Sequence, residues 1–238
     1  ANTPEALIAM LASASIGAIW SSASPEFGVN GILDRFGQIK PKLLVASNGY
    51  RYNGNAFARL DQLWALQRQM PSVHTVVVIS ELADVAIPEQ ATLVRWEDAL
   101  AAGRGHLPGF EQLPFDHPLY ILYSSGTTGV PKCLVHGAGG TLLQHSKELA
   151  LHGDIGAEDV LFYYTTTGWM MWNWLVSGLL TGAELILFDG SPSHPNLDTL
   201  WSLCEREGIT HFGTSARFLG TCRNAGLTPR QTHNLERL

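Results

Sequence analysis

The feature that most constrains the fold of this chain is a regular alternation between short apolar runs and longer segments of helical periodicity. Runs such as Leu43–Ala46 and Val76–Ile79 have the length and the branched side chains of buried strands. The segments between such runs repeat apolar residues at helical spacing and are bounded by Ser, Gly or Pro. Strands that alternate with helices predict an α/β fold with largely parallel sheets flanked by helices.

The predicted elements follow this alternation along the chain. Helices are expected over 4–14, with Thr3 as N-cap and Pro4 at the first helical position, and over 25–38, with Ser24 as N-cap. The remaining predicted helices cover 55–69, 96–102, 139–151, 170–181, 196–207 and 215–225. The predicted strands cover 17–21, 43–46, 75–80, 119–123, 133–136, 160–164, 184–188 and 209–213.

A looser stretch, residues 81–118, interrupts the alternation with several Pro and Gly residues. We therefore expect one α/β portion at 1–117 and another, carrying the loop discussed below, at 118–238. A length of 238 residues with 45% hydrophobic and 15% charged residues fits a well-packed globular protein. The net charge of −6 and the lack of a Lys/Arg cluster exclude the nucleic-acid-binding classes.

The cysteines and the long apolar stretches bear on the compartment. Three widely spaced cysteines without a C-x-x-C pair predict a reducing, cytoplasmic setting and no zinc site: Cys133, Cys204 and Cys222. Ala6–Trp20 lacks the basic flank of a signal peptide. Trp169–Phe188 has the length of a membrane span, but it contains Asn173 and Glu184, so we interpret its second half as a buried strand. The sequence thus predicts a soluble protein.

The segment Ser124–Lys132 reads S-S-G-T-T-G-V-P-K and lies between two predicted strands. Glycines without Cβ let backbone N–H groups approach an anion, the hydroxyls add donors, and Lys132 adds a mobile positive charge. The segment is not a Walker A loop, because Pro131 precedes the lysine and Cys133 follows it. The pattern predicts a polyphosphate site, and the alternative is a plain Ser/Thr/Gly linker.

This segment resembles the phosphate loop of the adenylate-forming family, which includes acyl-CoA synthetases, adenylation domains and luciferases. Three further segments resemble the acetoacetyl-CoA synthetase branch of that family: Ala23–Gly28, Thr167–Trp174 and Asp189–Pro192. The resemblance covers nearly the whole chain and implies part of the large N-terminal domain of such enzymes. It implies that the adenine-binding segment, the magnesium-binding glutamate, the ribose-binding aspartate and the catalytic lysine lie downstream of this sequence.

The resemblance implies a two-step ligation with Mg²⁺. A carboxylate attacks the α-phosphorus of ATP and releases pyrophosphate, and the thiol of coenzyme A then displaces AMP from the acyl-adenylate. For this branch the acid is acetoacetate and the product is acetoacetyl-CoA, within lipid and fatty acid metabolism. Three alternatives stay open: another short-chain synthetase such as acetyl-CoA synthetase, a non-catalytic nucleotide-binding module, and a hydrolytic NTPase. We expect the 238-residue chain alone to have little ligase activity.

The resemblance also assigns residues. The expected phosphate-binding residues are Ser124, Ser125, Gly126, Thr127, Thr128, Gly129 and Lys132. The acyl pocket is expected at Gly168, Trp169, Met170 and Met171, and the alternative is a helix face buried in the core. Arg51 lies where acetyl-CoA synthetases use an arginine for a phosphate of coenzyme A, although Ser22–Ser24 replaces their glycines. No catalytic residue and no metal ligand are assigned within the chain.

The histidines and Cys133 have plainer interpretations. His136 ends the strand after the loop, and a substrate-side role and a strand-end role are equally open. His145 and His152 are predicted on a helix surface, and His211 at a strand start. The histidines show no metal-binding spacing. Cys133 is interpreted as a small strand residue rather than a nucleophile.

Overall fold

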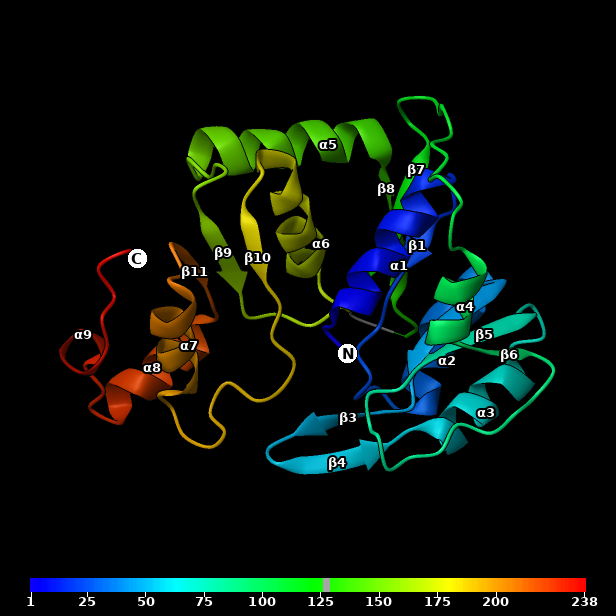
Figure 1. The fold of residues 1–238 in the computed structure, drawn as a ribbon, viewed down its shortest axis with the longest axis horizontal. Helices are drawn as coiled ribbons and strands as arrows, with labels where there is room; N and C mark the ends of the chain where they lie inside the picture. Colours follow the sequence, from blue (N-terminus) through cyan, green and yellow to red (C-terminus); the bar gives the residue numbers. More distant parts are fainter. Residues whose placement is uncertain (126–128) are drawn as a thin grey trace. The chain divides into compact units, whose positions relative to one another are not determined.

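The computed structural model describes residues 1–125 and 129–238, and its elements are shown in Figure 1. The contacts within the chain divide it into two compact units. The first unit comprises Ala1, residues 3–51 and residues 56–138, and the second comprises Asn2, residues 52–55 and residues 139–238. The predicted boundary between residues 117 and 118 falls inside the first unit and stays a prediction.

The first unit is built on a parallel sheet of order β2-β5-β6, formed by β2 (Leu43–Ser47), β5 (Thr75–Ile79) and β6 (Leu93–Arg95). Its helices are α1 (Pro4–Ser15), α2 (Val29–Ile39), α3 (Leu60–Gln69) and α4 (Trp96–Ala102). Phe36 of α2 and Leu63 of α3 share a buried core with Val76 and Val78, whose side chains are fully buried. These β-branched strand residues are buried as their pattern predicted.

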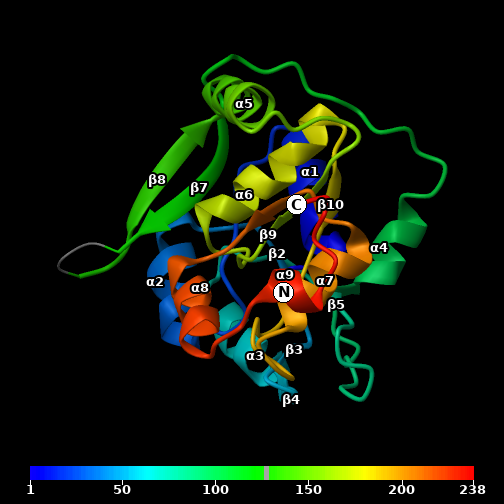
Figure 2. The same cartoon turned by 90° about the vertical axis from the view of Figure 1, so that its left-hand side faces the viewer.

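A second sheet of the first unit carries the predicted phosphate loop. Its order is β1-β7-β8, formed by β1 (Trp20–Ser21), β7 (Pro118–Ser124) and β8 (Lys132–Gly137). β1 pairs with β7 in parallel, whereas β7 and β8 form an antiparallel hairpin. Figure 2 shows the two strands of this hairpin side by side. The hairpin therefore brings the two ends of the predicted phosphate loop to one place.

The second unit contains a parallel sheet of order β10-β9-β11, formed by β9 (Val160–Tyr163), β10 (Glu184–Ile186) and β11 (His211–Gly213). Its α-helices are α5 (Ala138–Ser146), α6 (Met170–Val176), α7 (Thr199–Glu207), α8 (Ala216–Asn224) and α9 (Pro229–Thr232). Two further helical segments are the π-helix η1 (Lys147–His152) and the 3₁₀-helix η2 (Ser177–Thr181). The mainly parallel sheets with helices confirm the predicted α/β class.

Two predicted helix starts were wrong. Residues 55–58 do not begin a helix but form β4 (Asn55–Ala58), which makes a two-stranded sheet with β3 (Gly49–Tyr52). The turn between them is Asn53-Gly54, and both residues have positive φ, 48° and 76°. Asn-Gly is the strongest short hairpin signal, and it overrides the helical spacing that follows.

The second wrong start concerns Ser24. The helix α2 begins at Val29, and its N-cap is Gly28 rather than Ser24. Residues 25–27 form a turn instead of a first helical turn. Thr3 does occupy the N-cap position of α1, but its side chain makes no capping hydrogen bond.

The predicted helix over 139–151 changes character in its second half. The α-helix α5 ends at Ser146, and the chain continues as the π-helix η1. His145 is buried, which contradicts its predicted place on the helix surface, and its Nδ1 lies 2.7 Å from Ser177 Oγ. Ser177 Oγ in turn donates to the Asn173 carbonyl at 3.0 Å. His152, by contrast, is exposed as predicted.

Across residues 1–125 and 129–238, no helix combines the length and the apolar content needed to cross a membrane. The apolar stretch Trp169–Phe188 divides instead into α6, η2 and β10. Leu175 and Val176 of this stretch are buried in the second unit. The second half ends in a strand as predicted, but β10 is not buried: Glu184 is exposed and the other two strand residues are half-buried.

Candidate functional site

The β7–β8 hairpin closes the predicted phosphate loop at the pair Ser124 and Lys132, which face each other in the antiparallel register. Before this pair, the register joins Tyr123 with Cys133 and Leu122 with Leu134. Ser124 is half-buried, while Ser125 and Lys132 are exposed. The hydroxyl and ammonium groups at the mouth of the hairpin are thus presented to solvent by a regular strand pair.

Gly129 shows why this loop needs glycine on its far side. Its φ is 98°, a conformation that side chains other than hydrogen rarely adopt. Among the described residues, no heavy atom lies within 4 Å of the position that a Cβ would occupy there. The backbone at Gly129 is therefore open to a ligand. Gly126, Thr127 and Thr128, which belong to the same predicted set, lie outside the described residues.

A contact from α2 holds the far end of the loop. Gln38 Nε2 donates to the carbonyl oxygen of Pro131, at 2.8 Å, immediately before Lys132. The same amide group also donates to the Asp34 carbonyl within α2. Because the two residues are separated by 93 positions, no local pattern in the sequence predicts this contact. Gln38 is a residue that sequence reasoning missed.

The base of the hairpin is packed through Tyr123. Ser21 Oγ donates to the Tyr123 hydroxyl at 3.0 Å, and the same serine oxygen is also placed to donate to the Ile121 carbonyl at 2.9 Å. Burial raises the pKa of Tyr123 to about 12, an effect that the bond to Ser21 partly opposes. Arg35 lies 5.9 Å from the centre of the Tyr123 ring. The phenol is a neutral structural group at the foot of the loop.

His136 and Cys133 lie on β8. His136 pairs with Tyr120 across the hairpin, and the two ring centres are 5.0 Å apart. Burial lowers the pKa of His136, so the imidazole is neutral at pH 7. Cys133 carries a free, half-buried thiol and lies within the strand, where the sequence predicted it. Neither residue has the buried carboxylate or imidazole neighbour that an activated nucleophile needs in the described part of the chain.

The predicted acyl-pocket residues lie at the start of α6, in the second unit. Trp169 is the N-cap residue of this helix and is 67% exposed, and Met170 is 43% exposed. In the same helix, Trp172 and Asn173 are completely buried. Gly168 and Met171 are half-buried. Large apolar side chains that stay exposed beside a buried helix face favour a binding role over a purely core role.

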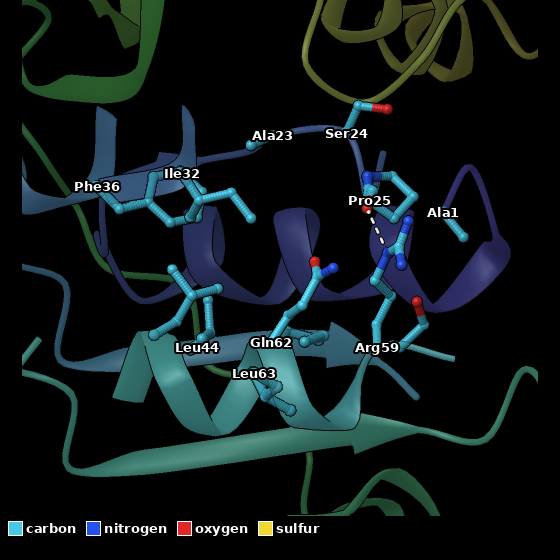
Figure 3. Close-up of a pocket in the computed structure, with 14 residues that line it drawn as sticks. Ala1, Ala23, Ser24, Pro25, Ile32, Phe36, Leu44, Arg59, Gln62 and Leu63 are labelled. Carbon is cyan, nitrogen blue, oxygen red and sulfur yellow. Dashed lines mark hydrogen bonds between the residues drawn. The ribbon is translucent and has the colours of Figure 1, made fainter. Parts of the chain in front are cut away.

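Arg51 lies on β3 and is exposed, and its guanidinium makes no hydrogen bond or ion pair with the described residues. The other arginine of this region, Arg59, is fully engaged. Its guanidinium donates to the Pro25 carbonyl at 3.3 Å and to the Tyr50 hydroxyl at 2.8 Å, and it lies 4.8 Å from the centre of the Tyr50 ring. Figure 3 shows Arg59 reaching the backbone of Pro25. Arg51 is the one of the two that is available to a ligand.

Arg59 borders a cavity of about 110 Å³ within the first unit. The cavity lies between α2, α3 and β2, and Figure 3 shows the residues around it. Its walls are largely apolar, with Ile32, Phe36, Leu44 and Leu63 beside the amide of Gln62. A cavity of this size and lining suits a small apolar group rather than a polyphosphate.

The structure groups the predicted residues into two sets. The described phosphate-loop residues meet at the mouth of the β7–β8 hairpin in the first unit, and the acyl-pocket residues follow one another at the start of α6 in the second unit. Among residues 1–125 and 129–238, no cluster of three or more His, Cys, Asp or Glu side chains is placed to hold a metal ion. The first set can bind an anion, and the second can border a small organic group.

Comparison with known proteins adds a family to this geometry. The profile of the family described as "AMP-binding enzyme" matches residues 1–238. Acetoacetyl-CoA synthetase of Gallus gallus is 52% identical over 243 residues, which include 100% of this chain. Malonamoyl-CoA synthetase vrtB of Penicillium aethiopicum is 43% identical over 97% of this chain. The solved structure of acetoacetyl-CoA synthetase from Streptomyces lividans superimposes with a TM-score of 0.93 at 45% identity.

The alignments cover all or nearly all of this chain but only part of each relative. The chain spans 36% of the Gallus gallus protein and 34% of the Penicillium aethiopicum protein. The Streptomyces lividans structure is likewise covered over 36% of its length, although all of this chain is aligned. The fold of the two units is therefore shared with part of a much longer synthetase.

Proposed function

Because the chain belongs to the AMP-binding enzyme family, we propose that it forms part of a ligase that joins a short-chain acid to coenzyme A. The acid is first activated as an acyl-adenylate with release of pyrophosphate, and the thiol of coenzyme A then displaces AMP. The observation that carries this proposal is the similarity to acetoacetyl-CoA synthetases along the whole chain, at 52% identity in the case of Gallus gallus. Acetoacetate is accordingly the proposed acid.

In this proposal the β7–β8 hairpin binds the β- and γ-phosphates of ATP. Lys132 supplies positive charge, Ser124 and Ser125 supply hydroxyl donors, and Gly129 leaves its backbone open. Gly126, Thr127 and Thr128 belong to the proposed set from the sequence pattern. The substrate carboxylate is itself the nucleophile, so the protein contributes by positioning and by stabilising charge on the pentavalent phosphorus.

The acyl pocket is proposed at the start of α6, with Trp169 and Met170 as its exposed apolar wall and with Gly168 and Met171 beside them. Two relatives are named for acetoacetate and for malonamate, and both acids carry a carbonyl group two bonds from the carboxyl carbon. We therefore extend the proposal to short-chain 3-oxo acids as a class, with acetoacetate as its first member.

The remaining ligands are also part of the proposal. Arg51 binds a phosphate of coenzyme A, because its guanidinium is exposed and can donate two hydrogen bonds at once. Mg²⁺ is expected with ATP, but the described residues include no ligand cluster to hold it, so no step is derived through the ion. The three free cysteines fit a reducing cytoplasm, where acyl-CoA formation would serve lipid and fatty acid metabolism.

The test is carboxylate-dependent exchange of labelled pyrophosphate into ATP by the native protein, with whatever sequence flanks this chain. The acids are acetoacetate, acetate, propionate and butyrate, and Thr128→Ala is the variant. We expect acetoacetate to drive exchange most strongly and the variant to lose most of it. We also expect the 238-residue chain alone to support little exchange, since it spans 36% of its relatives.

Other outcomes would change the proposal in defined ways. Exchange driven mainly by acetate, propionate or butyrate would keep the reaction and replace the acid. Binding of ATP without exchange for any acid would instead indicate a non-catalytic nucleotide-binding module. Release of orthophosphate in place of pyrophosphate would indicate a hydrolytic NTPase and would contradict the proposal.

A further inference from the structure

The β10-β9-β11 sheet has a topological switch point between β9 and β11. β9 lies in the middle, with β10 on one side and β11 on the other. The chain leaves β9 through α6 towards β10, and it leaves β11 through α8. In open parallel sheets, ligands bind beyond the carboxyl ends of two neighbouring strands whose following connections diverge in this way.

The packing of the helices places the two connections on opposite faces of the sheet. Leu161 of β9 shares a buried cluster with Leu175 of α6. Phe162, the next residue of β9, shares a different buried cluster with Phe218 of α8. Successive side chains of a strand point to opposite faces, so α6 and α8 cover opposite faces. The loops that lead to them therefore diverge from adjacent strand ends.

Each of these two loops carries a threonine hydroxyl that is buried without a partner. The Oγ1 atoms of Thr166 and Thr214 are inaccessible to solvent, and neither has a hydrogen-bond partner within the described residues. Thr166 follows β9, and Thr214 directly follows β11. Buried hydroxyls are nearly always hydrogen-bonded in folded proteins, so a pair of unpaired ones at a switch point calls for an explanation.

Backbone hydrogen bonds place Thr214 beside the paired ends of β9 and β11, and they place Thr166 at the start of a turn that leads to the proposed acyl pocket. Gly213 O accepts from Tyr164 N at 2.8 Å, which extends the β9–β11 pairing to the residue before Thr214. Thr166 O accepts from Trp169 N at 3.1 Å, so Thr166 begins the tight turn that ends at the pocket tryptophan. The two hydroxyls thus belong to the loops that end at the same edge of the sheet as Trp169.

We propose that Thr166 and Thr214 determine acid specificity by donating hydrogen bonds to the 3-oxo oxygen of the acyl substrate. The inference rests on the proposed function, and it adds the residues that distinguish one acid from another. A ketone oxygen accepts two hydrogen bonds, and each threonine hydroxyl has one proton to donate. An acid with a methylene group at this position leaves both hydroxyls unpaired and is rejected for that reason.

The experiment compares two acids of equal length in the pyrophosphate exchange assay of the native protein. Acetoacetate and butyrate differ in having a carbonyl or a methylene group at the third carbon. The variants are Thr166→Val and Thr214→Val, which remove the hydroxyl with little change in shape, and Thr166→Ser and Thr214→Ser, which keep it. The matched control is Thr221→Val, because Thr221 is an exposed residue of α8 whose hydroxyl donates to Arg217 O at 2.9 Å.

We expect each valine variant to lower kcat/KM for acetoacetate about 10- to 100-fold. The same variants should leave butyrate unchanged or improve it, the serine variants should retain the preference, and KM for ATP should not move. Equal losses for both acids, or an unchanged preference, would overturn the inference. If acetoacetate drives exchange and the preference survives both valine variants, only this inference fails. If no acid drives exchange in the unmodified protein, the proposed function fails with it.

Discussion

The β7–β8 hairpin of the first unit and the β9–β11 switch point of the second unit differ in the solvent exposure of their polar side chains. At the hairpin, Ser125 and Lys132 are exposed, so water solvates them when no ligand is bound. At the switch point, the hydroxyls of Thr166 and Thr214 are buried without a partner in the described chain. An exposed donor tolerates many anions, whereas a buried unpaired donor costs ~1–3 kcal/mol until a matching acceptor arrives.

Under the two proposals above, the two regions have different tasks. The hairpin would hold a charged group that is common to all the acids, because Ser125 and Lys132 are exposed and already hydrated. The switch point can discriminate among acids, because its donors are satisfied only by an acceptor in the right position.

The hairpin depends most on the charge of Lys132. Replacing it by methionine, Lys132→Met, should lower kcat/KM for ATP in pyrophosphate exchange about 100-fold, because a donor to a developing negative charge is lost. The loss should be the same with every acid that drives exchange. Lys147→Met is the control, since Lys147 is an exposed lysine paired with Glu148 at 3.3 Å. A loss that depends on the acid would contradict the shared role of the hairpin.

The switch point depends on a close approach of backbone and ring at Gly213. A Cβ at this position would overlap the ring of Tyr163. Gly213→Ala should therefore destabilise the protein by ~1–3 kcal/mol, measured as a lower urea midpoint with an unchanged m-value. Gly220→Ala is the matched control, because no heavy atom of residues 1–125 and 129–238 lies within 4 Å of its Cβ position in α8. Equal stability of both variants would mean that the sheet edge tolerates displacement.

The contact between Gln38 and Pro131 should have a smaller, selective effect. Gln38→Ala removes the 2.8 Å hydrogen bond that ties the loop end to α2. We expect KM for ATP to rise about 2- to 10-fold with little change in kcat, because the loop must then be ordered by the ligand. Gln69→Ala is the control, since the Gln69 side chain bonds only within its own helix, to Ala65 O. An unchanged KM would show that the hairpin is rigid without this contact.

The smallest effect at neutral pH concerns Tyr123. Burial raises the pKa of Tyr123 to about 12 from its ordinary value of 10.0. The folded protein therefore holds this proton more tightly than the unfolded chain, so the stabilisation is complete below pH 10 and is lost between pH 10 and 12. Titration by tyrosinate absorbance should show a late-titrating component that is smaller in Tyr123→Phe. Tyr52→Phe, at an exposed site, should leave that late component unchanged.

Much of the fold could be predicted because its elements are encoded locally. The runs Val76–Ile79 and Val160–Tyr164 are short and apolar, and both became central strands. The hairpin β3–β4 was not predicted although its Asn53-Gly54 turn is a strong local signal, because a segment of helical spacing follows this turn directly. His145 was misplaced for a different reason: the helix that carries it continues as a π-helix, and its partner Ser177 is 32 residues away.

The residues of the candidate site also fall into two groups, those that a local sequence pattern predicts and those that only the fold brings together. The loop pattern, the glycine at residue 129 and the lysine at residue 132 were visible in the sequence, since a phosphate loop is a continuous segment. The tie from Gln38 and the paired threonines after β9 and β11 were not visible, because each joins residues from separate elements. The roles of all these residues stay predictions until the exchange assays are done.

The α/β class, the position of the predicted phosphate loop between two strands, and the family could all be predicted from the amino-acid sequence. These follow from periodicity and from contiguous residue types, which act over a few positions of the chain. Three features emerged only from the folded chain: Gln38 bonds to the end of the loop, Arg59 is engaged while Arg51 is exposed, and two threonine hydroxyls are buried without a partner among the described residues. The burial of a side chain and its hydrogen-bond partners far away in the sequence depend on how distant segments pack, and a local sequence pattern does not predict that packing.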